Sequence, residues 1–341
     1  MGRVNVAVKR LEHDILDILA GVGLPAEEAK YVAASLLDAE QSGVESHGLM
    51  RLSAYIDRLE QGTAEPRPEI RVMENGAVAH VDGGNGLGQV VMSRAVDTCL
   101  TLAERYGVGI VSVCRSNHFG TAAFYSRRMA EQGYIGFAAS LAGPTMAPFG
   151  GMDLLLGTNP FSIAFPGGKM NFCADMASSA TAKGKIRIYA KNGKAIPLGW
   201  ALDEQGNDTT DPNAALKGIL LPMAGHKGYA LAMAVDALCG LLSGAALSGE
   251  SSSMFQGAQP ANTGHFAAAI DISRFLPLED FTQRAQDWFD RIHDSRTRPG
   301  VDRLLIPGEP EELLRAGRED CIEITMETAE MLRSYVKKYV Q

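Results

Sequence analysis

The amino-acid sequence predicts an α/β protein of the α+β type, with helices at both ends of the chain and a β-sheet between them. Apolar residues recur at helical spacing up to about residue 62 and again after residue 277. Between these parts, short apolar runs bounded by Gly, Pro and Asn indicate strands. We therefore expect one discontinuous helical domain, residues 1–68 and 276–341, around a sheet domain of residues 69–275.

Composition limits the kinds of partner that the protein can have. The chain has 341 residues, 46% of them hydrophobic, which is enough for two domains with buried cores. A net charge of -8 argues against the broad basic surface that nucleic acids and anionic membranes require, so we expect neither partner. The five cysteines are scattered without CxxC spacing, which predicts no disulfide framework, no metal site and a reducing cytoplasm as the location.

Three helices are expected at the N-terminus, over residues 6–20, from about residue 25 to 42, and through residues 45–62. The third would carry His47 and Arg51 four residues apart on one face. A guanidinium can hold a carboxylate by two hydrogen bonds, and an imidazole can give a proton to the neighbouring oxygen. A plain surface helix face with a capping serine is the alternative for this pair alone.

The first strands, residues 70–73 and 77–82, lead into the glycine-rich run Gly83–Gly88 and a helix over residues 89–106. This arrangement imitates a dinucleotide-binding motif, but the spacing would need glycine where Gln89 stands. The next strand, residues 110–114, also ends without the acidic residue that would bind a ribose. We therefore expect a turn here, and no Rossmann fold.

His118 lies between that strand and a helix that runs to about residue 132. A strand-to-helix turn is exposed at the edge of a sheet, where binding sites are common. A cap on the helix, or a bond to a backbone carbonyl, is an equally good explanation of this histidine. A further strand is expected over residues 135–140.

Asp175 closes the last of three short strands predicted at residues 154–156, 161–165 and 172–175. A carboxylate at the end of an apolar strand is half buried and needs a partner, for which a histidine is the natural candidate. Capping of the amides of Ala177 or Ser178 is the alternative. A β-hairpin is expected around residues 191–194, because Asn-Gly favours its turn.

Gly225–Gly228 opens a long apolar helix that is expected to end near residue 244. Glycines, Lys227 and free amides at a helix start can form an anion site, although glycine there can also serve close packing. Residues 249–264 predict a loop or lid, followed by a strand over residues 265–272. We expect the helices at residues 278–296 and 325–340 to pack on the N-terminal helices.

Taken in chain order, these motifs resemble the malate/L-lactate dehydrogenase family, which is unrelated to the Rossmann dehydrogenases. The resemblance covers nearly the whole chain, and its specificity lies in the ordered set. The motifs are Glu45-Ser46-His47-Gly48 with Arg51 and Tyr55, Ser116–Gly120, Gly157–Pro160, Asp175–Ser179, Gly199–Ala201, Thr210–Pro212, Gly225–Gly228 and Ile306–Glu309. Departures from the family pattern are Ala142, Ser178-Ser179 and Cys321, and the first leaves the choice between NAD and NADP open.

The resemblance implies a non-Rossmann, largely antiparallel sheet domain that binds NAD or NADP, a helical second domain and a homodimer whose subunits complete each other's sites. It implies that His47 donates a proton to the substrate, positioned by Ser46 and Asp175, and that Arg51 holds the substrate carboxylate. His118 would lie beside the nicotinamide, and in some members this histidine has the acid/base role. The residues implied to contact the cofactor are His118, Thr158, Asn159, Asp175, Met176, Ala177, Ser178, His226, Lys227, Gly228, Gly308 and Glu309, and Thr158 would also contact the substrate.

The expected reaction is hydride transfer between the nicotinamide and C2 of a small 2-hydroxy or 2-oxo acid such as malate, lactate or sulfolactate. Reduction of a cyclic imino acid (piperideine- or pyrroline-2-carboxylate) and oxidation of ureidoglycolate are alternatives within the family. A serine hydrolase using Ser46, His47 and Asp175 is a distant rival, because adjacent residues on a helix cannot readily point at each other. A non-catalytic binding module is the other rival.

Overall fold

A seven-stranded mixed sheet lies at the centre of the computed structural model, which describes residues 2–251 and 259–340. Neighbouring strands are antiparallel except β3 and β4, so the prediction of a largely antiparallel, non-Rossmann sheet is confirmed. In spatial order the strands are β2 (Arg71–Asn75), β3 (Val78–Asp82), β4 (Val108–Ser116), β10 (Thr263–Asp271), β5 (Tyr134–Ser140), β6 (Phe161–Phe165) and β7 (Phe172–Met176).

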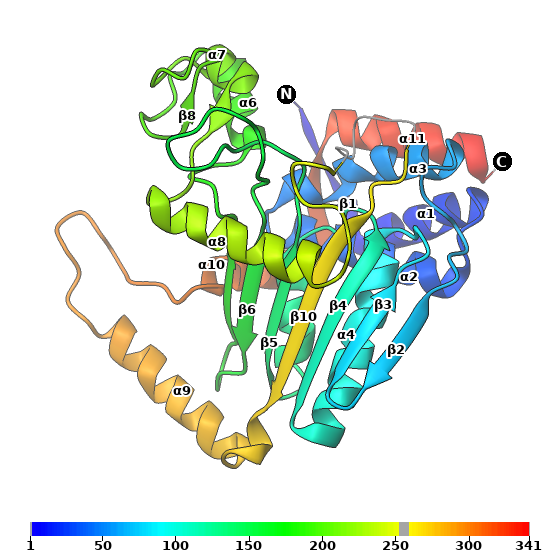
Figure 1. Cartoon of the computed structure of the whole chain (residues 1–341), viewed down its shortest axis with the longest axis vertical. Helices are drawn as coiled ribbons and strands as arrows, with labels where there is room; N and C mark the ends of the chain where they lie inside the picture. The colour runs from blue at the N-terminus through cyan, green and yellow to red at the C-terminus, as the bar shows by residue number, and fades with distance from the viewer. Residues whose placement is uncertain (1, 252–258, 341) are drawn as a thin grey trace.

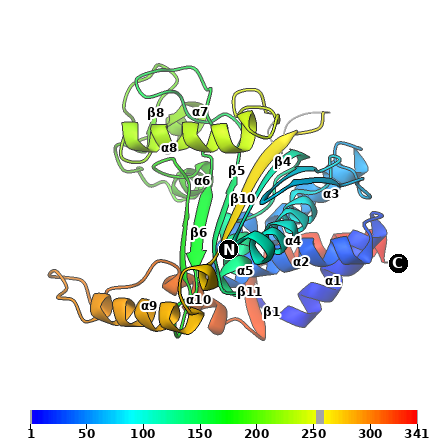
Figure 2. The same ribbon diagram turned by 60° about the horizontal axis from the view of Figure 1, so that its bottom comes forward.

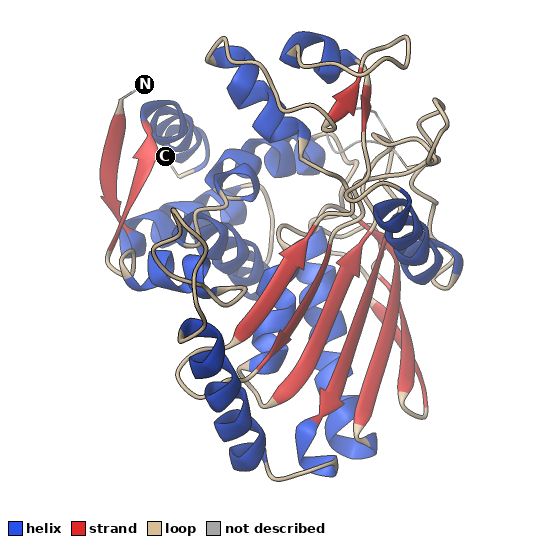
Figure 3. Ribbon diagram, turned by 90° about the vertical axis from the view of Figure 1, so that its left-hand side faces the viewer, coloured by secondary structure: helices blue, strands red, loops and turns tan. Residues whose placement is uncertain are grey.

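Helices α4 (Gly88–Tyr106) and α5 (Ala122–Ala130) cover one face of this sheet (Figure 2). Small residues in the strands, such as Ala138, Ala267 and Ala269, let the helices approach closely, and all three are fully buried. The other face has no comparable layer of helices over most of the described part of the sheet (Figure 3). Side chains on the sheet such as Ile163 and Ile270 are accordingly exposed.

The N-terminal helices are α1 (Val8–Gly21), α2 (Ala26–Gln41) and α3 (Leu52–Glu60). The predicted start of the first helix at residue 6 is wrong, because residues 3–7 form strand β1, which pairs with β11 (Cys321–Thr325). Val4 and Val6 alternate with polar residues and pair with Ile324 and Ile322. Their partner strand lies at the other end of the chain, so no local pattern could indicate it.

The C-terminal segment divides between two neighbours. Helix α10 (Glu309–Ala316) packs on α2, and α11 (Met326–Tyr339) packs on α1 as expected. Packing of the first C-terminal helix on the N-terminal helices is a wrong expectation. Helix α9 (Leu278–His293) reaches away from them (Figure 1), and its Phe289 packs against the hairpin of β6 and β7.

A smaller lobe stands beyond one end of the sheet, at the upper left of Figure 1. It contains α6 (Lys183–Lys191), α7 (Pro212–Lys217), β8 (Ala201–Leu202) and β9 (Ile219–Leu220). The hairpin predicted around residues 191–194 is wrong, since Asn192 and Gly193 end helix α6 instead of joining two strands. Buried Ile186 ties this helix to the core of the lobe.

Helix α8 (His226–Asp236), continued by the π-helical turn η3 (Ala237–Leu241), joins this lobe to the sheet and confirms the predicted long apolar helix. The strand expected at residues 154–156 is wrong, because only Leu156 forms a single bridge there, to Met146. The loop expected at residues 249–264 lies partly outside the described residues, at 252–258. The short turn η4 (Ile272–Arg274) follows β10. None of the helices in residues 2–251 and 259–340 has the length and apolar character needed to cross a membrane.

Candidate active site

His47 and Arg51 lie on two short 3₁₀ turns, η1 (Glu45–His47) and η2 (Leu49–Arg51), which precede α3. The prediction that one helix carries both residues is therefore wrong. Gly48 separates the turns and is buried so tightly that an added Cβ would lie 2.4 Å from the Glu40 carboxylate. The backbone of Gly48, with φ -89° and ψ -146°, is not helical and separates the two turns.

Within this segment the side chains contact each other. Ser46 Oγ lies 2.9 Å from His47 Nδ1, and Arg51 Nε donates to the Ser46 carbonyl at 2.5 Å. The expectation that Ser46 cannot reach His47 is wrong, because the tight turns bring the adjacent side chains together. Burial, reinforced by the charge of Arg51, lowers the pKa of His47 to about 4, so the imidazole is neutral at pH 7.

His118 lies between β4 and α5, half buried at the end of the sheet. Its Nδ1 is 2.8 Å from the Tyr55 hydroxyl and accepts the Gly120 amide proton at 3.3 Å. An amide can only donate, so Nδ1 is the acceptor and the ring proton is on Nε2. Burial, with smaller effects from His47 and Arg51, lowers the pKa of His118 well below its ordinary value.

The structure brings the two histidines together. Their rings stack with centroids 5.5 Å apart and an interplanar angle of 22°. His47 comes from the helical part and His118 from the sheet, so the site lies where the two parts meet. Tyr55, on α3, contacts His118 and was not predicted as a site residue. Its spacing of four residues from Arg51 is the signal that could have indicated it.

The glycine-rich run before α4 forms the turn that the sequence predicts and supports the His118 segment. Asn117 Nδ2 donates to the Gly86 carbonyl at 2.8 Å. A Cβ on Gly88 would lie 2.2 Å from the Asn117 carbonyl, so only glycine allows the two backbones to approach this closely. The run therefore holds the residues that precede His118, instead of binding a phosphate.

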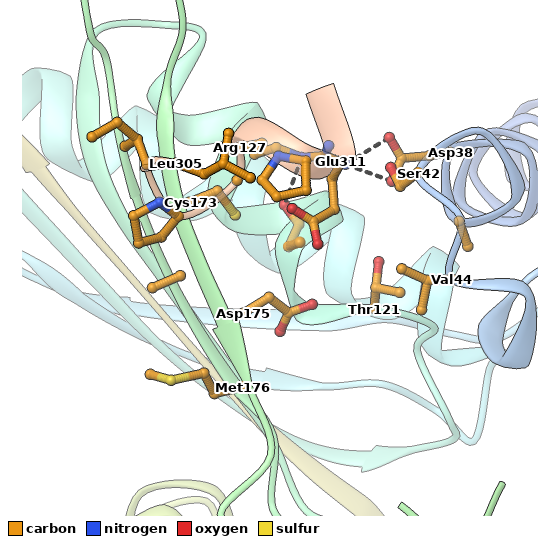
Figure 4. Close-up of a pocket in the computed structure, with 17 residues that line it drawn as sticks. Asp38, Ser42, Val44, Thr121, Arg127, Cys173, Asp175, Met176, Leu305 and Glu311 are labelled. Atoms are coloured by element: carbon orange, nitrogen blue, oxygen red, sulfur yellow. Dashed lines mark hydrogen bonds and ion pairs between the residues drawn. The ribbon is translucent and has the colours of Figure 1, made fainter. Parts of the chain in front are cut away.

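A cavity of about 510 Å³ lies beside the histidine segments (Figure 4). Val44, three residues before His47, and Thr121, three residues after His118, face Asp175 across it. Its remaining lining comes from the end of α2, from α5 and β7, and from α10 with the segment before it. These residues are Asp38, Ala39, Ser42, Ala123, Arg127, Cys173, Ala174, Met176, Leu305, Ile306, Pro307, Gly308, Pro310 and Glu311. Arg127 binds both carboxylate oxygens of Asp38, at 2.5 and 2.6 Å.

Among the described residues, no histidine bonds to Asp175, so the predicted partner is not found there. Its carboxylate accepts the backbone amide of Ala123, at the start of α5, so the expected capping of Ala177 or Ser178 is also replaced. Sheet packing places β7 beside α5, a contact that chain order does not indicate. Asp175 is exposed to the cavity, and desolvation by the protein around it raises its pKa to about 6, against the opposing effects of Ala123 and Arg127.

Gly308 lines the cavity in the left-handed conformation, with φ +93°, and a Cβ there would lie 2.9 Å from Cys173 Cβ. Glu309 points elsewhere, since its Oε2 accepts from the Ile306 amide at 2.9 Å and lies 2.8 Å from His293 Nε2. Of the cofactor residues implied by the resemblance, Asp175, Met176 and Gly308 therefore line one cavity.

The remaining implied cofactor residues form a packed junction before α8. The Thr158 carbonyl accepts both the amide and the hydroxyl of Ser178, each at 2.8 Å. Asn159 is fully buried, and its side chain is engaged by Ala142, Ala232, Asp236 and Ser248. The Gly228 amide donates to the Met223 carbonyl at 2.9 Å and is not free for an anion. His226 and Lys227, beside it, are exposed, and Ala177 joins this junction to β7.

Two further cations lie on α6, and one of them, Arg187, comes near Arg51. Arg187 lies close enough to Arg51 for their positive charges to interact, and together with burial, the larger effect, this lowers the pKa of Arg51. Lys183 is partly buried beside Arg187, and its pKa is lowered by burial and then by that charge. The sequence showed these cations only as part of a basic stretch.

An arginine, two neutral histidines and an adjacent cavity are the equipment of an enzyme that acts on a small carboxylic acid. The particular family follows from comparison: residues 6–333 match the malate/L-lactate dehydrogenase family, and the chain belongs to it. This match confirms the predicted family and the predicted activity, that of an NAD(P)-dependent dehydrogenase acting on 2-hydroxy acids. The likeness to solved structures of the family confirms the non-Rossmann fold.

The similarity extends over whole chains. The malate dehydrogenase of Pyrococcus horikoshii is 39% identical over 315 residues, 90% of this chain and 87% of its own. The solved sulfolactate dehydrogenase of Methanocaldococcus jannaschii has a TM-score of 0.94 at 36% identity, covering 98% of this chain and 97% of that one. A (2R)-3-sulfolactate dehydrogenase (NADP(+)) of Chromohalobacter salexigens is 33% identical over 333 residues, 97% of each chain. The ureidoglycolate dehydrogenase (NAD(+)) of Escherichia coli K12 is 32% identical over 315 residues, 91% of this chain and 89% of its own.

Proposed function

We propose that the site formed by His47, His118 and Arg51 interconverts a 2-hydroxy acid and its 2-oxo acid, with NAD or NADP as hydride carrier. The observation that carries this proposal is the meeting of the two imidazoles, 5.5 Å apart, beside Arg51 and a cavity. No step of this reaction needs a metal bound by the residues named.

The cavity fits part of a dinucleotide. Its volume of about 510 Å³ is within the range of ligand sites, and Met176 and Ile306 offer apolar walls to a flat ring. Asp175, Met176 and Gly308 would hold the cofactor, which supplies or accepts the hydride when bound. Since Asn159 and Glu309 have buried or engaged side chains, we assign them to supporting this region.

Arg51 would bind the substrate carboxylate and thereby orient C2, because a guanidinium forms two parallel hydrogen bonds to a carboxylate. His47 would donate the proton to the 2-oxo oxygen during reduction and accept it during oxidation. Being neutral at pH 7, His47 is ready to act as the base, and a bound carboxylate that offsets Arg51 would raise its pKa toward the acid form.

One observation favours the alternative assignment of the acid to His118. Its Nδ1 accepts from both Tyr55 and Gly120, which fixes the proton on Nε2. A fixed Nε2–H is well suited to hold the substrate oxygen. The two assignments differ in which histidine, when removed, abolishes turnover without affecting cofactor binding.

The cations on α6 favour substrates with a second anionic group. Arg187 adds positive charge near Arg51, with Lys183 next to Arg187, and a single carboxylate would leave that repulsion incompletely offset. We therefore infer that dianions such as oxaloacetate or 3-sulfopyruvate are preferred over pyruvate. The same charge disfavours the uncharged ring of piperideine-2-carboxylate and the neutral end of ureidoglycolate.

Steady-state kinetics with oxaloacetate, 3-sulfopyruvate, pyruvate and piperideine-2-carboxylate, each with NADH and NADPH, tests both levels of this proposal. Arg187→Gln should lower kcat/KM for the dianions by about tenfold and leave that for pyruvate nearly unchanged. Lys185→Gln is the matched control, because Lys185 lies over the Trp200 ring, 5.0 Å away. Equal loss with pyruvate would contradict the dianion preference, and absence of turnover with every acid would contradict the dehydrogenase.

The hydrolase rival loses its third member, because the Asp175 carboxylate accepts from Ala123, and no hydrogen bond between it and His47 occurs among the described residues. A non-catalytic binding module would bind the cofactor without turnover, and the same assays would distinguish it from an enzyme.

We also propose that the chain divides into one domain of residues 1–68 with 276–341 and a second of residues 69–275. Limited proteolysis would test it.

A homodimer in the cytoplasm completes the proposal. Apolar side chains lie uncovered on α8, η3 and the segment before α9, and Leu241, Leu242 and Phe275 are each more than half exposed. Exposed apolar side chains of this size favour burial against a second copy. Light scattering on the purified protein would show twice the chain mass, and a monomer would contradict this part of the proposal. The cytoplasmic location rests on the scattered cysteines, which are free in the structure.

A further inference from the structure

Glu40 is a buried acid that the reaction described above does not use. It lies one residue before the end of α2, with 4% of its surface exposed. A carboxylate at a helix C-terminus is unfavourable, because the last carbonyls carry partial negative charge. A buried charge in such a place needs compensation from its surroundings.

The compensation comes from the segment that carries His47 and Arg51. Glu40 Oε1 accepts the Leu49 amide proton at 2.8 Å, in a buried hydrogen bond. Gly48 packs directly against the same carboxylate, since a Cβ added to it would lie 2.4 Å from Glu40 Oε1. The Leu49 side chain is fully buried in the helical core. Glu40 therefore holds the Gly48–Leu49 peptide, which lies between the His47 turn and the Arg51 turn.

We propose that Glu40 is a positioning residue, whose carboxylate sets the relative placement of His47 and Arg51 by fixing the Gly48–Leu49 peptide. This inference rests on the proposed function only for what the two residues do. The placement itself follows from the contacts. Without the acceptor, the buried Leu49 amide loses its partner and the two turns can shift. A displacement of about 1 Å at a catalytic group can lower a rate by about a hundredfold.

The surroundings of Glu40 move its pKa into the neutral range, so that its protonation changes near pH 7. The pKa of Glu40 is raised to about 7, chiefly by burial and also by Glu45 on η1, against the opposing effects of the Leu49 amide, Arg3 on β1 and Arg318 after α10. The ionised form is the stronger acceptor. The segment is therefore held more firmly above pH 7 than below it.

Two substitutions at Glu40 separate positioning from general stability. Glu40→Gln keeps an oxygen that can accept from Leu49 but cannot ionise, whereas Glu40→Leu removes the acceptor. With rates normalised to NADH-binding sites, Glu40→Leu should raise KM for the 2-oxo acid, lower kcat by about tenfold or more and leave NADH affinity unchanged. Glu40→Gln should retain most of kcat and lack the step near pH 7 in kcat/KM.

The matched control is Glu45→Gln, on the same segment, which breaks the surface ion pair with Arg3 and removes a charge that raises the pKa of Glu40. Above pH 7, where Glu40 is ionised in both proteins, it should leave kcat, KM and the Leu49 amide unchanged. Unaltered kinetics in Glu40→Leu, or equal losses in Glu40→Gln and Glu40→Leu, would overturn the proposal. Hydrogen exchange gives a readout without substrate: the Leu49 amide should be protected in the wild type and in Glu40→Gln and exchange faster in Glu40→Leu. If the wild type reduces no 2-oxo acid, the dehydrogenase assignment fails, and exchange still decides whether Glu40 holds the peptide.

Discussion

The segments that carry His118 and His47 differ in how firmly they are built. On the sheet side, the Asn117 carbonyl lies 3.1 Å from His265 Nε2, and its side chain accepts from Arg58 Nε at 3.0 Å. His265 is fully buried and stacks on Phe119. On the helical side, Ser46 is exposed and His47 has that serine as its hydrogen-bond partner. Tyr55 and Gly120 therefore hold His118 in a single tautomer at the end of a firmly built strand, and two short turns carry His47.

This difference suits two separate tasks. A group that orients substrate gains from a fixed donor, because no reorganisation is then needed during the reaction. A group that gains and loses a proton must change its hydrogen bonding in each turnover. The less constrained His47 fits the second task and the firmly held His118 fits the first. Four predictions test this comparison, in decreasing order of expected effect.

The largest effect is expected from His47→Ala, which should lower kcat by about a hundredfold or more, the usual contribution of a placed general acid. NADH affinity should change little, whereas His118→Ala should weaken it. Stopped-flow turnover and NADH fluorescence titration measure the two quantities. If His118→Ala abolishes turnover with NADH binding intact while His47→Ala remains active, the roles are exchanged.

Gly88→Ala attacks the support of His118. The new Cβ would lie 2.2 Å from the Asn117 carbonyl and 2.5 Å from the His118 backbone, so main chain must move. Overpacking of this kind should destabilise the protein by about 2 kcal/mol or more and reduce kcat. Urea unfolding measures the first effect. Gly184→Ala on α6 is the control, since nothing lies within 4 Å of its Cβ, and equal behaviour of the two variants would contradict the close approach.

Tyr55→Phe removes one of the two donors to His118 Nδ1. Phe fills the same buried space, so the expected loss is one hydrogen bond, worth about 1 kcal/mol and about fivefold in kcat. Nitrogen NMR of the imidazole should show a mixture of tautomers in place of the Nε2–H form. A spectrum identical to that of the wild type would show that Gly120 alone fixes the ring.

The smallest effect is expected from Asp175→Asn, which keeps an acceptor for the Ala123 amide and removes the charge. The folded pKa of Asp175, about 6, lies above the ordinary value of 3.8. Its contribution to stability is therefore complete below pH 3.8 and is lost as the pH rises through about 6. Thermal unfolding from pH 4 to pH 7 should show this loss in the wild type and a smaller one in the variant. Parallel curves would indicate that cavity solvent keeps the carboxylate ionised.

Local sequence patterns determined most of the elements and the family. Period-two and helical spacing placed β3, α4 and β5 within two residues of their observed bounds. The ordered motifs around His47, His118 and Asp175 identified the family that comparison confirmed. These signals are local, because a helix or strand is encoded by residues that are neighbours in the chain.

Tertiary structure decided which contacts form between residues that are not neighbours in the chain. Residues 3–7 became a strand because β11 offered Ile322 and Ile324 as partners. The regular helix expected across Gly48 is interrupted there, where φ is -89° and ψ is -146° and the next amide, that of Leu49, donates to Glu40. Asp175 binds the start of α5 instead of a histidine because sheet order places β7 there. In each case a contact between segments distant in sequence outweighed local preference, since burial and hydrogen-bond satisfaction depend on which surfaces meet.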